Sequence, residues 1–386
     1  MKYQSRTWLL LGALWVVVSG AASLLAQDRS SQNALTLEQQ GRNAEAEQAW
    51  QSIARSNPQN AEAFAHLGLS EARQQHYDVA IANYRKALVL NPALPGLQMN
   101  LALALFKAKD FKDSIKPFTI ELNKHPDDQR LTILLGMAHY GMGDYFVAIP
   151  YLRRAADRDP QSLPLRLALA HSCLWSKQNQ CVLNVYKQIL ALNAESAEAD
   201  MLAGEALDET GDNAGATEQF RAAVRANPKE PNVHFGLGYL LWTQNHFSEA
   251  AKEFQAELDN DPHHLQARAY LGDSYVHLND FAKAQPELEK AVTADPSFAL
   301  VRLDLGIVYG EEGRKSEAIK ELQKAIALDP KDVAPHWRLA KLYQSIGRKE
   351  DAKFEFAKAS TMNKESLQAS HVLYEKLLQT QRSPQQ

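Results

Sequence analysis

Residues 299–332 read ALVRLDLGIVYGEEGRKSEAIKELQKAIALDPKD, and this stretch decides the fold. Apolar residues around Leu303 lead to Gly313, after which apolar side chains from Ala318 to Leu328 recur at steps of three and four residues. The pattern predicts two helices, with Gly313 in the turn that joins them. Neither helix can bury its apolar stripe against its partner alone. The stretch is therefore a repeat that must stack on copies of itself.

Proline recurs along the chain with a period of 34 residues. Counting back from Pro330 in steps of 34 meets a proline seven times in eight, and Ala194 in the remaining step. Each proline follows Asn, Asp or His and ends a second helix, because it lacks an amide hydrogen and its ring clashes with the preceding turn. This period places nine repeats over residues 61–366. The prolines are Pro58, Pro92, Pro126, Pro160, Pro228, Pro262, Pro296 and Pro330.

Small residues recur at two positions of each repeat, counted from Ala61 as position 1 of repeat 1. Position 8 is Gly or Ala in all nine repeats, and position 20 is Ala in seven of them. Small side chains at these positions let the paired helices approach closely. Position 24 is always aromatic or Leu, as in Tyr84 and Leu322.

These positions resemble the tetratricopeptide repeat (TPR) family. The resemblance implies an all-α fold, a right-handed α-solenoid superhelix of tandem helix-turn-helix TPR units, whose first helices line a concave groove. The chain departs from the family at position 4, where the family's aromatic residue survives only as Phe64. That position is partly exposed in such repeats, so the expected fold is unchanged.

The two ends of the array differ from the regular repeats. Residues 27–60 form a degenerate first TPR unit, with a polar first helix suited to a solvent-facing end. Residues 367–381 are expected to be a C-terminal capping helix, since Tyr374 stands where a small residue would admit a further partner. Residues 382–386 carry no apolar pattern and are predicted to be a disordered tail.

The amino terminus has the pattern of an export signal. Lys2 and Arg6 precede an uncharged apolar stretch, residues 7–26, that ends in small residues. Cleavage after Ala26 would release a periplasmic or secreted protein. The alternative is an N-terminal membrane anchor, since residues 7–26 are long enough to span a bilayer. Contact with the membrane is expected only in that uncleaved form.

The charge balance argues against nucleic acid as a partner. The chain has 42 Lys and Arg against 46 Asp and Glu, a net charge of −4. Nucleic-acid binding would require basic residues gathered on one face. A protein or peptide partner is expected instead.

Apolar side chains stand at the first-helix positions that line the groove in the TPR family. An apolar stripe in a concavity is typical of a site that docks a peptide or helix. The alternative is that superhelical coiling, or a neighbouring helix, buries much of the stripe as ordinary core. The predicted groove residues are Met99, Leu103, Phe106, Ile133, Met137, Tyr140, Leu167, Leu174 and Trp175 in repeats 2 to 4, and Phe235, Tyr239 and Trp242 in repeat 6.

Repeat 5 has an acidic groove surface between these apolar stretches. Glu205, Asp208 and Glu209 occupy groove positions of its first helix. Carboxylates gathered in this way would steer a basic partner toward the groove.

The sequence has no recognised catalytic or metal-binding pattern. Its 12 histidines are dispersed, none in an H-E-x-x-H motif, and G-x-S-x-G and P-loop motifs are absent. We therefore expect no enzyme activity, no metal site and no cofactor.

Cys173 and Cys181 are the only cysteines. They fall on the facing helices of repeat 4, and exported chains keep disulfides. A bond between them would staple the repeat that has lost its proline to Ala194. The alternative is two buried thiols packed as small apolar groups.

Two functions fit these features. The first is a non-enzymatic scaffold outside the cytoplasm that holds a peptide, helix or protein in the groove, in envelope or complex assembly. The second is a polysaccharide-binding protein in which Tyr140, Trp175, Tyr239 and Trp242 stack on sugar rings. The sequence favours the scaffold, because sugar sites also require polar side chains clustered around the aromatic rings.

Overall fold

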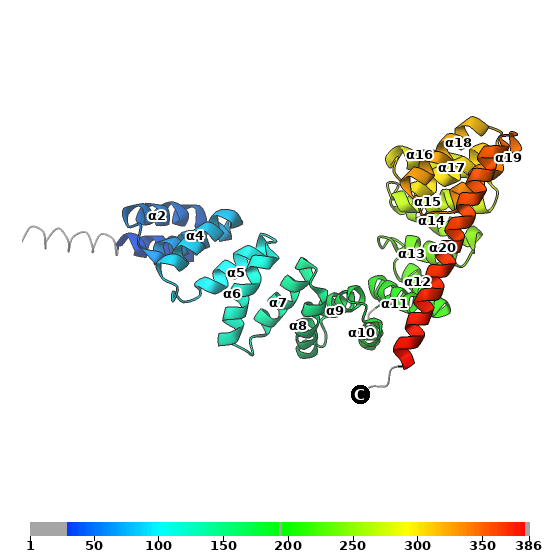
Figure 1. Ribbon diagram of the computed structural model, residues 1–386. Coiled ribbons are helices and arrows are strands. Elements are labelled where there is room, and N and C mark those ends of the chain that lie inside the picture. The colour runs from blue at the N-terminus through cyan, green and yellow to red at the C-terminus, as the bar shows by residue number, and fades with distance from the viewer. Residues whose placement is uncertain (1–28, 193–194, 383–386) are drawn as a thin grey trace, which may run out of the picture. The chain divides into compact units, whose positions relative to one another are not determined.

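The computed structural model describes residues 29–192 and 195–382, with side chains up to residue 365. All regular elements in these ranges are helices (Figure 1). None of these helices combines the length and apolar composition that crossing a bilayer requires. The predicted signal or anchor, residues 1–26, lies outside the described residues, as do residues 383–386 of the predicted tail.

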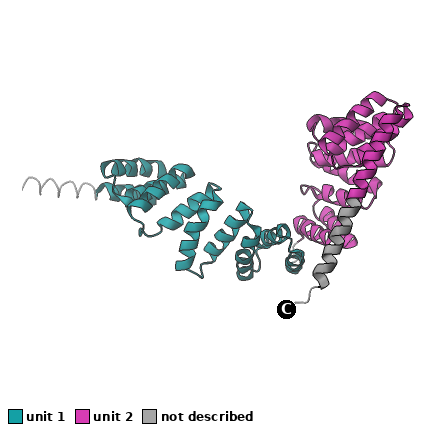
Figure 2. Cartoon of the chain, in the orientation of Figure 1, with its two compact units in different colours: residues 1–194 teal, residues 195–386 magenta. Residues whose placement is uncertain are grey.

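The chain divides into two compact units (Figure 2), unit 1 over residues 1–194 and unit 2 over residues 195–386. The division falls at Ala194, the position at which the proline period is broken. In unit 1, residues 29–39 are helical and are followed by α2 (Asn43–Ser56), α3 (Ala61–Arg73), α4 (Tyr77–Leu90), α5 (Leu97–Lys107), α6 (Phe111–Lys124), α7 (Gln129–Met142), α8 (Tyr145–Arg158), α9 (Leu163–Trp175) and α10 (Asn179–Ala191).

Unit 2 continues the same series of helical hairpins. Its helices are α11 (Ala197–Glu209), α12 (Asn213–Ala226), α13 (Val233–Thr243), α14 (Phe247–Asn260), α15 (Leu265–His277), α16 (Phe281–Ala294), α17 (Ala299–Glu311), α18 (Lys315–Leu328), α19 (Ala334–Ser345) and α20 (Lys349–Arg382). The first helices α11, α13, α15, α17 and α19 contact one another in order. The predicted all-α array of stacked hairpins is confirmed.

The small residue at position 8 receives the large side chain at position 24. A Cβ atom on Gly68 would come within 2.9 Å of the Tyr84 ring, and one on Gly238 within 2.9 Å of the Phe254 ring. Both rings are fully buried. Glycine is thus required at these two sites, because a larger side chain would displace the aromatic ring that the partner helix places there.

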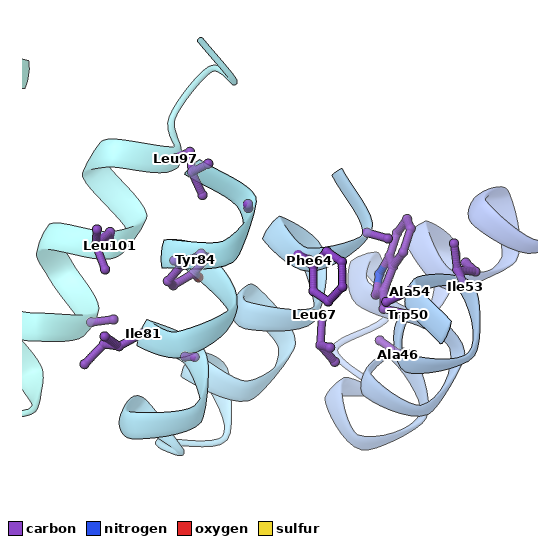
Figure 3. Close-up of a cluster of buried hydrophobic side chains, with 14 of the residues drawn as sticks. Ala46, Trp50, Ile53, Ala54, Phe64, Leu67, Ile81, Tyr84, Leu97 and Leu101 are labelled. Carbon is purple, nitrogen blue, oxygen red and sulfur yellow. The ribbon is translucent and has the colours of Figure 1, made fainter. Parts of the chain in front are cut away.

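Core side chains join successive hairpins. In unit 1, one cluster runs from Trp50 on α2 through Phe64 and Tyr84 to Leu101 on α5 (Figure 3). Burial of each large apolar side chain contributes about 1.5–3 kcal/mol. This cluster therefore joins successive hairpins of unit 1, as a stack of interdependent hairpins requires.

The turn within each repeat uses the left-handed backbone region at position 15. Gly313 has φ +78°, as the sequence predicts for a turn glycine, but Lys109 (φ 63°) and Asn279 (φ 57°) adopt the same conformation without glycine. The turn is therefore set by the hairpin, and glycine is the residue that fits it without strain.

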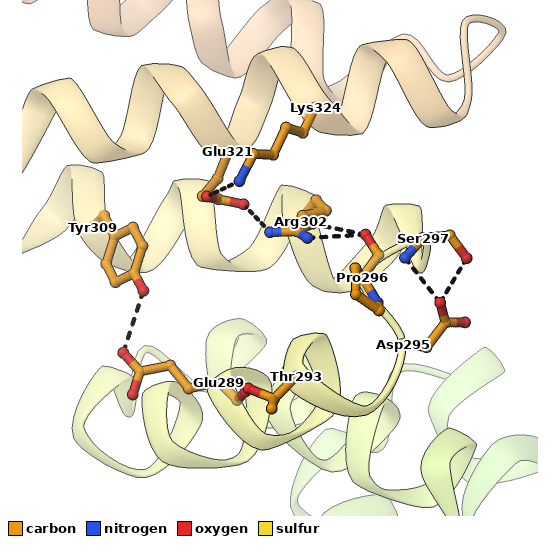
Figure 4. A network of polar contacts seen from close by, with 9 residues as sticks. All are labelled: Glu289, Thr293, Asp295, Pro296, Ser297, Arg302, Tyr309, Glu321 and Lys324. Atoms are coloured by element: carbon orange, nitrogen blue, oxygen red, sulfur yellow. Dashed lines mark hydrogen bonds and ion pairs between the residues drawn. The ribbon is translucent and has the colours of Figure 1, made fainter.

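Position 4, where the chain departs from the TPR pattern, carries a basic side chain paired with Glu at position 23 in repeats 6 to 9. Arg302 lies 2.7 Å from Glu321, which also binds Lys324 at 2.8 Å (Figure 4). A second guanidinium nitrogen of Arg302 donates to the Pro296 carbonyl at the repeat junction. The corresponding pairs are His234–Glu253, Arg268–Glu287 and His336–Glu355.

The carboxyl end of the array is one long helix. α20 runs from Lys349 through the end of repeat 9 and the predicted cap without a break. Lys364 stands at position 32, where the other repeats have the helix-ending proline. Nothing in the sequence therefore interrupts the helix at that point.

Candidate functional site

The acidic and aromatic groove positions meet in one cavity of unit 2. Glu205, Asp208 and Glu209 lie on α11 at helical spacings of three and four residues, so they share a face, and all three are exposed. Phe235 and Tyr239 project from α13 into the same cavity, which has a volume of about 450 Å³. We call it the acidic cavity; its other lining residues are Met201, Phe220, Asn232, Gly236 and Leu240.

Aromatic rings on α13 and α15 form a continuous wall beside the acidic cavity. Tyr239 is 40% exposed, and its ring centroid lies 6.0 Å from that of Trp242 and 5.4 Å from that of Tyr270. Trp242 and Tyr270 are 5.0 Å apart. Burial raises the pKa of Tyr270, and the nearby Tyr239 and Asp273 raise it further. The wall therefore offers neutral rings next to carboxylates, an arrangement that suits a cationic side chain.

The predicted groove residues on α5 and α7 serve partly as core. Met99, Leu103 and Phe106 are half-buried and pack against the cluster around Phe118. The Phe106 ring meets the edge of Phe118 at 6.1 Å. Ile133 and Met137 on α7 and Leu167 on α9 are also half-buried.

Tyr140 and Trp175, also predicted groove residues, belong to an aromatic cluster beside the end of α9. Trp175 is 48% exposed, and its ring centroid lies 6.0 Å from Tyr140 and 4.4 Å from Tyr145. The prediction that Leu174 lines the groove is wrong, because this side chain is only 4% exposed. It follows the buried Ala170 by one helical turn and so lies on the inward face of α9.

Cys173 on α9 and Cys181 on α10 are joined as a disulfide, with their Cα atoms 5.8 Å apart. The bond links the two helices of repeat 4, the last hairpin of unit 1. Among the described residues, no group of three or more His, Cys, Asp or Glu side chains could hold a metal ion.

Three polar or aromatic residues of unit 2 were not foreseen from the sequence. Tyr270, Asp273 and Asp304 lie on α15 and α17 and continue the lining of the first-helix face beyond Trp242. Asp273 could have been found from the repeat register, because it stands at position 9 of repeat 7, one of the groove positions. Tyr270 and Asp304 share position 6, which the family pattern does not assign to the groove.

Family models described as tetratricopeptide repeat match most of the chain. One matches residues 32–96, 67–129, 99–162, 183–231, 235–299 and 271–333, and another matches residues 309–377. A curated TPR repeat-containing protein of Methanocaldococcus jannaschii is 24% identical over 152 residues, 39% of this chain. The chain spans only 27% of that relative's length.

Solved structures of other repeat proteins are also similar. MamA from Desulfovibrio magneticus RS-1 is 22% identical, with 45% of this chain and 97% of that one covered at a TM-score of 0.41. A chain of the Cut9–Hcn1 hetero-tetramer of the APC/C is 18% identical, with 78% of this chain and 58% of that one covered at a TM-score of 0.48. YrrB, described as a TPR protein with an unusual peptide-binding site, is 19% identical, with 49% of this chain and 97% of that one covered at a TM-score of 0.40. The matches to the family models, which together cover residues 32–162, 183–231 and 235–377, show that the chain belongs to the tetratricopeptide repeat family.

Proposed function

We propose that this chain is a non-enzymatic interaction scaffold outside the cytoplasm that binds a basic segment of a protein or peptide partner in the acidic cavity of unit 2. TPR proteins bind protein or peptide partners, and the TPR fold typically serves as a non-catalytic scaffold. The observation that carries the finer proposal is the meeting of Glu205, Asp208 and Glu209 with Phe235 and Tyr239 around one cavity.

The cavity chemistry favours a cationic side chain. Three exposed carboxylates on one helical face attract positive charge at long range, which raises association rates more than it raises affinity. The rings of Phe235 and Tyr239 then offer apolar and cation–π contacts to the stem and head of Lys or Arg. A volume of about 450 Å³ accommodates one such side chain together with adjacent backbone.

Export is part of the proposal and rests on the amino-terminal sequence. Lys2 and Arg6 before the uncharged residues 7–26 are the features of a signal peptide, and an uncleaved segment would anchor the scaffold to the membrane. The partner would in either case be an envelope or secreted protein. Mass spectrometry of the amino terminus of the purified exported chain decides between cleavage after Ala26 and an anchor.

The binding proposal is tested by charge reversal. In the variant Glu205→Lys, Asp208→Lys, Glu209→Lys, association with basic peptides selected from a random pool should slow by about tenfold, and its salt dependence should flatten. The matched control reverses Glu218, Glu249 and Asp259, which are exposed on the second helices α12 and α14 of the same unit. Equal association rates for the two variants would remove the acidic cavity as the site.

Polysaccharide binding remains the competing function, since the acidic cavity does place polar side chains next to the exposed ring of Tyr239. The same titrations with envelope glycans discriminate between the two. Glycan binding that survives the triple charge reversal, without any peptide binding, would favour the sugar-binding function.

A further inference from the structure

A second cavity on the first-helix face of unit 2 is lined by basic side chains. It has a volume of about 320 Å³ and lies between α17 and α19. Lys315, the first residue of α18, and Arg338 and Lys341 from α19 line it. Glu311 from α17 is the single acidic residue of its lining. We call it the basic cavity, since its cations outnumber its carboxylates.

The basic cavity occupies the same place in its repeats as the acidic cavity does. Both are lined by positions 9, 12, 13 and 24 of one repeat and by positions 6, 9 and 10 of the next. In the acidic cavity, the first of the two repeats supplies the charge through Glu205, Asp208 and Glu209. In the basic cavity, the second repeat supplies it through Arg338 and Lys341. The chain therefore forms the same hollow twice, with opposite charge.

The cations of the basic cavity are exposed and are not neutralised by ion pairs. Among the described residues, no ion pair or hydrogen bond joins Lys315, Arg338 or Lys341 to a carboxylate. Neighbouring cations do have such partners, since Arg314 pairs with acidic residues of its own turn and Lys324 pairs within α18. The positive charge at the cavity is therefore available to a partner.

The two cavities belong to one continuous face of unit 2. The ring centroid of Trp242 lies 6.0 Å from that of Tyr239 in the acidic cavity. Trp242 also lines a third cavity, about 360 Å³ in volume, beyond the aromatic wall. Ile307 and Arg338 line both this third cavity and the basic cavity. One extended segment can therefore pass along the aromatic wall and contact both charged cavities.

We propose that the basic cavity holds the carboxylate of an Asp or Glu side chain, on the same segment whose basic residue occupies the acidic cavity. The inference rests on the proposed function and adds a second charge to the partner. Lys315 and Lys341 attract a carboxylate at long range, and the guanidinium of Arg338 matches its two oxygens. Ile307 and Leu342 offer apolar contacts to its methylene groups. The groove of unit 2 is thus bipolar.

The stacking of the first helices fixes the spacing of the two charges on the partner. The acidic cavity lies between α11 and α13 and the basic cavity between α17 and α19, three repeats further along the chain. Packed helices lie about 8–10 Å apart, so roughly 24–30 Å separate the cavities. An extended peptide covers that distance in about seven to nine residues. A segment whose opposite charges stand much closer together can reach only one cavity.

Selection of peptides by the full chain tests this charge pattern. The probe is a random pool of displayed peptides about 20 residues long, enough to span both cavities in an extended form. Peptides captured by the native chain should be enriched in a basic and an acidic residue about seven to nine positions apart. The variant Lys315→Glu, Lys341→Glu should capture peptides that keep the basic residue and lose the acidic one. Arg338 is left unchanged because its charge also acts on the buried Asp304.

The matched control reverses two other exposed lysines of unit 2. The variant Lys252→Glu, Lys320→Glu changes the second helices α14 and α18 by the same total charge and should capture the native pattern. All four substituted lysines are exposed, so both variants should fold, and circular dichroism checks this.

A captured peptide shows which carboxylate is bound once it is resynthesised with an acetylated amino terminus and an amidated carboxyl terminus. Only its side chains then carry charge. Replacement of its acidic residue by the neutral amide should raise the dissociation constant about fivefold with the native chain and leave it unchanged with Lys315→Glu, Lys341→Glu. Replacement of the same residue by Lys should restore binding to that variant. Loss of binding on amidation alone would overturn the proposal in favour of a terminal carboxylate.

The outcomes of the selection keep the two proposals apart. Basic peptides without the acidic residue, or equal acidic enrichment by the native chain and the Lys315→Glu, Lys341→Glu variant, would refute the basic cavity alone. Acidic peptides that require Lys315 and Lys341 but contain no basic residue would refute the proposed function alone. Capture of no peptide would refute both.

Discussion

At the scale of single residues, position 15 of each repeat adopts the left-handed backbone conformation whether or not the residue there is glycine. Position 15 is glycine in repeat 8 (Gly313, φ +78°) but lysine in repeat 2 (Lys109, φ 63°). An L-residue with a Cβ is strained in that region by roughly 1–2 kcal/mol, whereas glycine is not. In repeats with a larger residue at this position, replacement of that residue by glycine should therefore be stabilising.

Replacing Lys109 by glycine should raise the stability of unit 1 by about 0.5–1 kcal/mol, because the relief of strain exceeds the added entropy of the unfolded chain. Thermal and urea unfolding of the variant measure the gain. The mirror substitution, Gly313→Ala, should cost a similar amount in unit 2. A destabilised Lys109→Gly variant would contradict the strain argument.

The basic residue at position 4 is the second residue-scale feature. Arg302 and Glu321 are both largely buried and lie 2.7 Å apart. Truncation of one partner of such a pair leaves an uncompensated buried charge. Arg302→Ala should therefore lower the free energy of unfolding by about 3 kcal/mol. Arg314→Ala, which removes a half-exposed partner of the exposed Glu317, should cost less than about 1 kcal/mol.

Acid provides an independent check of the same pair. Burial opposes ionisation of Glu321, but hydrogen bonds from Lys324 and Arg302 outweigh it and lower its pKa below the ordinary 4.5. A carboxylate with a lowered folded pKa stabilises fully above pH 4.5, and this contribution is lost as the pH falls through the folded value. Urea unfolding from pH 6 to pH 3 should show this loss in the native chain. Arg302→Ala should lose less over that range.

At the scale of elements, the period of the sequence predicted the helices and their turns, while the polar partners across each hairpin were not anticipated. Gly313 marked its turn, and the prolines marked the ends of second helices, because these residues act through their own backbone. The pairing of Arg302 with Glu321 spans two helices, and in the sequence alone position 4 stands out only as a lost aromatic residue. Such pairing depends on how adjacent helices are aligned.

Groove assignments show the same limit. Glu205 and Tyr239, which repeat position assigns to the groove, line one cavity, whereas Leu174, assigned in the same way, is buried by the packing of α9. Position within a repeat gives the direction of a side chain relative to an average hairpin. The rotation of each helix against its neighbours depends on the side chains that it packs against, and one sequence does not reveal that rotation.

The disulfide of repeat 4 yields a prediction at this scale. Cys173 and Cys181 close a loop with a sequence separation of 8 residues. Cross-linking so short a loop should stabilise the hairpin by about 2 kcal/mol, and Cys181→Ser should lose that amount. A thiol assay on the exported protein, unfolded without reductant, should find no free thiol. Two free thiols would show that the cysteines are unpaired.

At the scale of the whole molecule, the proposed binding site lies in one of the two compact units, unit 2. The acidic cavity and the aromatic wall both belong to residues 195–386. Unit 1 contains the Tyr140–Trp175 cluster and the disulfide. In a repeat protein each hairpin is stabilised mainly by its neighbours, so a run of several repeats can fold without the rest.

A fragment of residues 195–386 should therefore retain the acidic cavity and bind basic peptides as the full chain does. Its helical circular dichroism should match that of the corresponding part of the full chain. Selected basic peptides should bind with a dissociation constant within about threefold of the full-chain value, a difference of less than 1 kcal/mol. Residues 27–194, expressed separately, should not bind these peptides. A folded 195–386 fragment that lost peptide binding would show that unit 1 contributes contacts to the partner, and the acidic cavity would then be only part of the binding surface.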